Sequence, residues 1–261
     1  MPALVTEPRL LIATILCTMG SAALSVLKPR WRQVEVGLSL LAVLCVAASI
    51  ALSASRRAAW PLASKAEVIM ATAAATVLWH IVDRRVREPR IGALAHVVAV
   101  GLLLWGVARW RGALPPPPLP GSSAALLAAA QQPWLLAARL ALVLAWGALV
   151  EAGCLAAACL LLAHSDEPLA LHESTLAVPK PAPLGLVFLT ASLFLQGLGG
   201  AYTHGVYWSW SAVESWHLLV WLYYAATWCA SSASTWVETR LRWLPIPGML
   251  LTFLALRAVG A

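Results

Sequence analysis

Long apolar stretches, separated by short polar segments, occupy almost the whole chain. A helix needs about 20 mostly apolar residues to cross a bilayer. Most of these stretches are apolar all round rather than along one face, which is typical of helices enclosed by lipid or by other helices. The pattern therefore predicts an all-α, polytopic integral membrane protein with about eight transmembrane helices. We place them at Leu10–Leu27, Val36–Ser53, Val68–Val82, Ile91–Ala108, Trp134–Ala163, Leu184–Tyr202, Trp216–Ser231 and Trp243–Leu256.

The composition supports this prediction. Of 261 residues, 61% are hydrophobic and 11% are charged, whereas a soluble domain is about 45–50% apolar and 25% charged. The five cysteines lie in apolar stretches and form no C-x-x-C pair, which argues against a disulfide framework, a zinc ribbon or covalent haem attachment. The net charge of +7 fits basic loops beside anionic lipid headgroups, so we expect a lipid bilayer and no nucleic acid as partner.

The densest cluster of basic residues, Arg84–Arg90, follows the third predicted helix. Cytoplasmic loops of membrane proteins are enriched in Lys and Arg. Placing this cluster in the cytoplasm puts both termini and the loop His204–Ser215 on the outer side. Residues 111–133, which include Pro115–Pro118, are expected to form a loop rather than a folded domain.

Tryptophan is concentrated late in the chain, where seven of the 14 Trp residues lie between Trp208 and Trp243. Membrane-interface belts explain isolated Trp residues, but a dense run is less common. On a helix, spacings of 3, 4, 3 and 4 place one set of side chains on a single face. The residues with this spacing are Glu214, His217, Trp221, Tyr224 and Trp228. Such a stripe either binds a large planar ligand or packs against a neighbouring helix.

Residues 205–224 read G-V-Y-W-S-W-S-A-V-E-S-W-H-L-L-V-W-L-Y-Y. This run resembles the tryptophan-rich signature of the cytochrome c assembly family, W-G-x-Y-W-S-W-D-P-K-E-x-W-x-L-x-x-W-L-x-Y, and most closely its CcsA type. Weaker similarity reaches back to Pro61, Ser64 and Glu67, which resemble the family's entry to a helix. We accordingly divide the chain into an N-terminal transmembrane helix pair, residues 1–60, and an assembly-like transmembrane domain, residues 61–261, with an outward Trp-rich loop near 201–216.

The resemblance implies haem handling or delivery at the outer face of the cytoplasmic (inner) membrane during cytochrome c maturation. Its implied partners are a ResB-type membrane subunit and apocytochrome c, and its implied cofactor is haem. Whether the chain itself catalyses haem ligation is left open. Two alternatives also stay open: a diverged non-haem structural or regulatory subunit of a membrane complex, and a small-molecule transporter.

The chain departs from the family at the positions of the usual haem-ligand histidines; the intramembrane histidine that ends the family's tryptophan signature is Cys229 here. Iron is commonly held by His, so we expect His204 or His217 to contact the iron or a propionate. Arg139 is expected either to pair with a propionate, because guanidinium binds carboxylate well, or to extend its charged end to the membrane interface. The ring itself is expected to lie against Trp208, Trp210 and Trp216, with Tyr207 and Glu214 supporting the loop.

Three further polar residues fall at or within predicted helices. Charged groups inside a membrane are costly and usually face the bundle interior, so Glu151 is expected to have a function or an interior partner. His80 and His96 have no counterpart in the tryptophan-rich signature. We expect each of them to form a hydrogen bond to a neighbouring helix.

Overall fold

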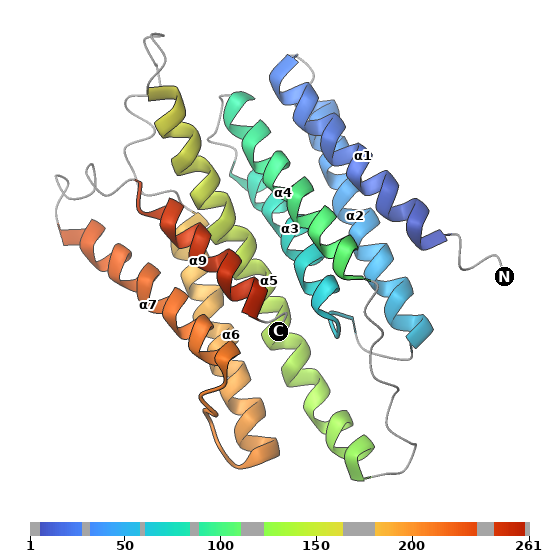
Figure 1. Ribbon diagram of the computed structural model, residues 1–261, viewed down its shortest axis with the longest axis vertical. Coiled ribbons are helices and arrows are strands. Elements are labelled where there is room, and N and C mark those ends of the chain that lie inside the picture. The colour runs from blue at the N-terminus through green and yellow to red at the C-terminus, as the bar shows by residue number, and fades with distance from the viewer. Residues whose placement is uncertain are drawn as a thin grey trace.

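The computed structural model describes residues 6–27, 32–57, 61–83, 89–110, 123–163, 181–233 and 243–258. These residues form helices and short turns, with no strand among them (Figure 1). The helices are α1 (Thr6–Leu27), α2 (Arg32–Arg57), α3 (Lys65–Val82), α4 (Pro89–Arg109), α5 (Ser123–Ala163), α6 (Pro181–His204), α7 (Ala212–Ala233) and α9 (Pro245–Ala258). The all-α fold class is confirmed.

Six of these helices, α1 to α6, are long and apolar enough to cross a membrane. Helix α7 has 22 residues but is not one of the six, since its Trp, Tyr, Ser, Glu and His residues lower its hydropathy. Helix α9 is apolar but has only 14 residues. A multi-pass membrane protein fits this architecture, and α7 and α9 are the two helices whose sequences depart from ordinary membrane spans.

Helix α5 is longer than the sequence predicted. It begins at Ser123 and continues through Pro133 for 41 residues, so the predicted loop at 111–133 is wrong for its last part; residues 111–122 lie outside the described part. The segment before Pro133 is rich in Ala and Leu, which have the highest helix propensity. A proline inside a helix removes one backbone hydrogen bond, and here it does not end the helix.

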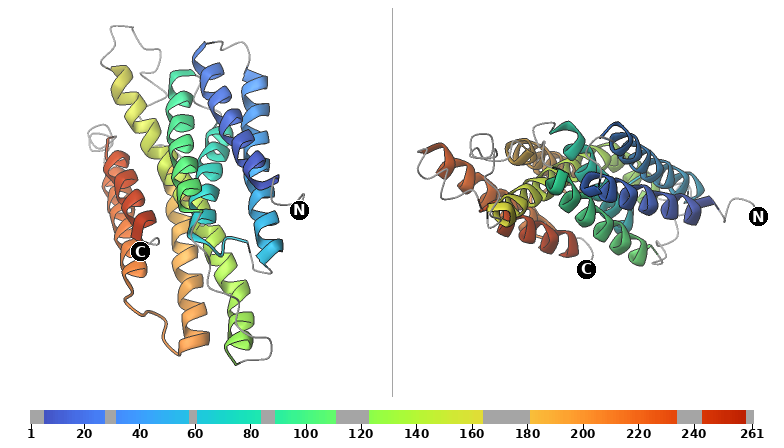
Figure 2. Two further views of the ribbon diagram at one scale, coloured as in Figure 1. Left: turned by 45° about the vertical axis from the view of Figure 1, so that its right-hand side comes forward. Right: turned by 90° about the horizontal axis from the view of Figure 1, so that it is seen from above.

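Helix α5 lies at the centre of the bundle, against α3, α4, α6 and α9 (Figures 1 and 2). Helices α1 and α2 pack together, with α1 against α4 and α2 against α3, while α7 packs on α6 and α9. One apolar core runs through the bundle and includes Val46 of α2, Met70 of α3, Trp146 of α5 and Leu189 of α6. The predicted boundary near residue 60 falls outside the described residues, and this core draws on helices from both sides of it.

Glycines set the closest helix contacts, as small residues do in membrane bundles. A Cβ placed on Gly147 of α5 would lie 2.5 Å from the Cβ of Ala75 in α3. A Cβ on Gly185 of α6 would lie 2.7 Å from Leu149 of α5. Both neighbours of α5 therefore approach it at positions where no side chain fits.

The order of the helices gives the bundle two distinct ends (Figures 1 and 2). At one end α1 and α3 finish and α2 and α4 begin. At the other end α6 passes into α7 through residues 205–211, which we call the Trp loop. Asp83 and Pro89, between which most of the basic segment runs in the sequence, thus lie at one end and the Trp loop at the other; residues 84–88 themselves lie outside the described part.

Candidate functional site

The Trp loop begins where a glycine ends α6. Gly205 has a φ of +70°, and its N–H donates to the carbonyl of Ala201 at 3.1 Å. A glycine in the left-handed region is a common way to finish a helix, because it has no Cβ to strain. The family signature has glycine at the same place. His204, the last residue of α6, leads directly into the loop, and its side chain lies outside the described part of the structure.

The loop folds back against two glycines of α6. A Cβ on Gly200 would lie 2.9 Å from the carbonyl oxygen of Val206, and one on Gly197 would lie 3.3 Å from that of Tyr207. Side chains at these positions would push the loop away from the helix. The glycines of α6 thus hold the aromatic residues of the loop close to the end of the bundle.

Glu214 organises the rest of the loop. Its Oε2 accepts hydrogen bonds from the backbone N–H of Ser209 at 2.9 Å, from the Ser209 hydroxyl at 2.8 Å and from the N–H of Ser211 at 3.2 Å. The N–H of Glu214 donates in return to the Ser211 hydroxyl at 3.3 Å. Ser211 and Glu214 therefore form a capping box at the start of α7. Ser211 occupies the family's Asp position and supplies an N-cap, a role that Asp also performs well.

The aromatic side chains of the loop differ in exposure. Tyr207 is 65% exposed and Trp210 is 72% exposed. Trp208 is partly buried, and its ring meets that of Trp210 edge to face with centroids 6.0 Å apart. The Nε1 of Trp208 is buried without a hydrogen-bond partner. Trp216 instead packs against the apolar core, so Tyr207 and Trp210 provide the open aromatic surface.

The predicted stripe on α7 is largely a packing face. His217 is 1% exposed and meets Trp146 of α5 edge to face at 5.3 Å. Trp221 donates from Nε1 to the Thr190 hydroxyl of α6 at 2.8 Å. The buried Tyr224 hydroxyl lies 3.4 Å from the carbonyls of Leu149 and Pro245. These contacts join α7 to α5, α6 and α9.

The side chain of His217 is enclosed, and this determines whether its ring nitrogens can reach a ligand. Both of its ring nitrogens are buried without a hydrogen-bond partner among the described residues. Two free lone-pair or N–H positions suit a ligand, but the ring is closed in against Trp146 and away from solvent. Tyr207 and Trp210 form an exposed aromatic surface, whereas the His217 side chain does not reach solvent. The structure therefore places His217 inside the bundle, apart from the exposed Tyr207 and Trp210, although we expected all three to contact one ligand.

Arg139 has a structural partner. Its Nη1 donates to the carbonyl of Leu62 at 2.6 Å, in the turn that precedes α3. That turn leads to Ser64, which caps α3 in a capping box with Glu67. The predicted helix entry at Pro61, Ser64 and Glu67 is thus confirmed, and Arg139 of α5 holds the chain that leads into it.

The polar residues inside the bundle also have partners. Glu151 of α5, for which the sequence offered no partner, contacts His80 of α3 with 2.9 Å between Oε1 and Nδ1. His96 of α4 lies 3.0 Å from the Ser39 hydroxyl of α2. The expectation that both histidines bond to neighbouring helices is confirmed. Sequence alone gave no signal for Glu35, which joins these residues from the first turn of α2.

Comparison with protein-family models finds no match, and comparison with curated proteins finds no similar protein. The likeness to the cytochrome c assembly family therefore rests on individual residues of the sequence, chiefly those of the Trp loop and α7.

Proposed function

We propose that this protein handles haem at the Trp loop, on the outer face of the cytoplasmic membrane, as part of a cytochrome c maturation system. The observation that carries the proposal is an exposed aromatic surface, Tyr207 and Trp210, held in place by the three hydrogen bonds to Glu214. Large aromatic faces left exposed commonly mark a binding surface.

A rigid aromatic surface suits a flat, largely apolar ligand. Each large aromatic side chain that is covered contributes a few kcal/mol, about 1.5–3 for a fully buried one. Trp210 also adopts a φ of 55°, which is unusual for a bulky residue. Strained residues gather at ligand-binding sites, where the surrounding structure holds them. Glu214 and Gly205 provide that surrounding structure here.

In this proposal Tyr207, Trp208 and Trp210 hold the ring, with Trp216 supporting the loop from the core side. His204, at the entrance of the loop, is the candidate iron ligand. Arg139, the predicted propionate contact, and His217 are secondary candidates. Haem bound here would supply the iron porphyrin that is later joined to cysteine thiols of an apocytochrome, with a ResB-type membrane subunit as the partner.

The test is to express the full chain with its candidate partner under haem-replete conditions and to record the absorbance spectrum and haem content after purification. We expect a haem band in the unaltered protein and at least a twofold lower haem content in Tyr207→Ala and Trp210→Ala. His204→Ala should change the position of the band more than either aromatic substitution, because it removes an iron ligand rather than ring contact.

Trp228→Ala is the matched control. Like Trp210, Trp228 is exposed. It lies in α7, 14 residues beyond Glu214, which is about 21 Å along a helix, and is therefore distant from the Trp loop. Its substitution should leave haem content unchanged. Protein that carries no haem in the presence of its partner would refute the proposal and favour the non-haem subunit.

A further inference from the structure

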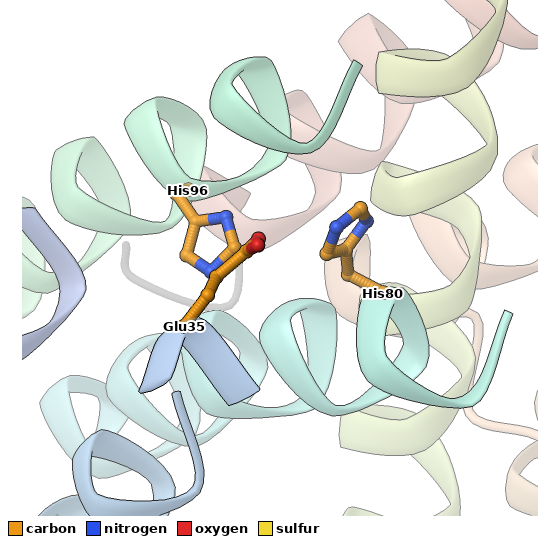
Figure 3. A group of neighbouring side chains, drawn as sticks. All are labelled: Glu35, His80 and His96. Carbon is orange, nitrogen blue, oxygen red and sulfur yellow. The ribbon is translucent and has the colours of Figure 1, made fainter. Parts of the chain in front are cut away.

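A second group of side chains lies at the end of the bundle opposite the Trp loop. Glu35 in the first turn of α2, His80 in the last turn of α3 and His96 near the start of α4 point toward one another (Figure 3). One ligand atom from each lies within 4.8 Å of the others. His96 is fully buried, and Glu35 and His80 are partly buried. We call these three residues the α2–α4 cluster.

His80 is oriented by a carboxylate from a fourth helix. Its Nδ1 lies 2.9 Å from Oε1 of Glu151, whose side chain is fully buried. With the carboxylate as acceptor, Nδ1 carries the proton and Nε2 keeps its lone pair. Metal-binding histidines are commonly held in this way, because the second-shell carboxylate fixes the tautomer and raises the basicity of the ligating nitrogen.

The other ring nitrogen of His80, Nε2, and the carboxylate of Glu35 both lie beside a glycine of α4. A Cβ placed on Gly92 of α4 would lie 2.7 Å from His80 Nε2 and 3.6 Å from Glu35 Oε1. The glycine therefore leaves room for these two groups to approach. A larger residue at position 92 would push the His80 ring out of its present place.

His96 is also held firmly. Its Nδ1 lies 2.8 Å from the carbonyl of Gly92, which can only accept, so Nδ1 donates. Its Nε2 lies 3.0 Å from the Ser39 hydroxyl, which in turn lies 2.6 Å from the Ser21 hydroxyl of α1. Ligation of a cation by His96 exchanges one of these bonds for a coordinate bond, while the other continues to orient the ring.

Glu151 supplies a second observation that points to a bound cation. Its Oε2 is buried and has no hydrogen-bond partner among the described residues. A buried carboxylate oxygen without a partner is costly. A positive charge bound on His80 would stabilise this carboxylate through the imidazole that joins them.

From this geometry we infer that the α2–α4 cluster binds a divalent transition-metal cation, with Glu35, His80 and His96 as ligands and Glu151 as the carboxylate that orients His80. Two imidazoles and one carboxylate favour ions such as Zn²⁺, Fe²⁺ or Co²⁺ over Mg²⁺ and Ca²⁺, which prefer oxygen ligands. Donor atoms around tetrahedral zinc are about 3.3 Å apart, so small side-chain rotations bring the ligands into place. This inference does not depend on haem binding.

The experiment uses the full chain in detergent, with no histidine tag and after removal of metals by a chelator. Titration with Zn²⁺ followed by calorimetry should show one ion bound per chain. Co²⁺ should give visible absorption bands characteristic of nitrogen and oxygen ligands. Glu35→Gln and His80→Gln should each weaken zinc binding at least tenfold, and Glu151→Gln should weaken it about 10- to 100-fold.

His217→Gln is the matched control, because it replaces another fully buried histidine that lies outside the cluster. Its zinc affinity should equal that of the unaltered chain. Zinc should also raise the melting temperature of the unaltered chain, since a ligand that binds only the folded state stabilises it, and Mg²⁺ should not. This measurement decides the matter if a cluster variant fails to fold. Equal zinc affinity in the unaltered chain and in folded His80→Gln, or no zinc-dependent rise in melting temperature, would overturn the inference.

Discussion

Trp210 combines two features that ordinary folding does not explain. Its φ of 55° lies in the left-handed region, which costs roughly 1–2 kcal/mol for a residue with a Cβ. The side chain is 72% exposed, so burial of the indole offsets little of that cost. Gly205, in the same loop, adopts a left-handed φ without strain. A large strained residue in so exposed a place is consistent with selection for binding rather than for stability.

Replacing Trp210 by glycine should therefore stabilise the protein while weakening its ligand binding. We expect Trp210→Gly to raise the free energy of unfolding by up to about 1 kcal/mol, because glycine adopts positive φ freely. Trp210→Ala keeps the strain and loses the same indole, so it should be no more stable than the unaltered chain. Thermal denaturation in detergent measures both. A glycine variant less stable than the alanine variant would show that the strain argument is incorrect.

His217 is a second residue whose presence is not explained by the stability of the fold. Both ring nitrogens are buried without partners, as is the Nε1 of the adjoining Trp146. An unsatisfied buried polar group costs about 1–3 kcal/mol. His217→Leu should accordingly be as stable as the unaltered chain or more stable, whereas His217→Asn, which keeps an unpaired polar group, should be less stable.

Melting curves of the three proteins, measured without haem and then with haem, test this directly. If His217 ligates the haem iron, His217→Leu should be no less stable than the unaltered chain without haem. Its melting temperature should then rise less than that of the unaltered chain when haem is added. A marked loss of stability in the leucine variant without haem would instead mean that the imidazole makes a necessary contact in the folded chain.

At the scale of the helices, the sequence predicted where each described helix lies but placed most helix starts a few residues late. The two Ser-x-x-Glu segments, at Ser64–Glu67 and Ser211–Glu214, both start helices through capping boxes. The early start of α5 was missed because Pro133 was taken as a boundary. Contacts between helices were not predictable in the same way: the pair of Glu151 with His80 joins residues 71 positions apart and depends on how α3 and α5 pack.

Helix packing leads to a prediction at Gly147. A methyl group there would lie 2.8 Å from the backbone carbonyl carbon of Ala75, and backbone atoms cannot move aside easily. We expect Gly147→Ala to destabilise the protein by about 1–3 kcal/mol, the usual cost of overpacking. Gly101→Ala is the matched control, because nothing lies within 4 Å of a Cβ at that position of α4; alanine there should be neutral or stabilising.

Both variants are compared by their melting temperatures in one detergent. Equal melting temperatures for the two would mean that α3 and α5 separate at little cost, and that Gly147 does not fix their contact.

The whole molecule carries different chemistry at its two ends. Aromatic residues of the Trp loop lie at one end, and the α2–α4 cluster lies at the other, where α3 ends and α4 begins. Helix α6, which leads to the Trp loop, has 24 residues and spans about 36 Å, which exceeds the roughly 30 Å of a bilayer core. Helix α6 is thus long enough to cross a membrane, with the Trp loop at one end of the bundle and the α2–α4 cluster at the opposite end.

This separation predicts which reagents reach each end in intact cells. In a variant with its five cysteines replaced, Ser211→Cys should react with a membrane-impermeant thiol reagent added outside, because the basic segment favours the cytoplasm for the opposite end. Asp83→Cys, at the end of α3, should react only after the membrane is permeabilised. Labelling of Ser211→Cys solely from the cytoplasmic side would contradict both the orientation and delivery of haem at the outer face. Labelling of both positions from outside would contradict the placement of the two ends across the membrane.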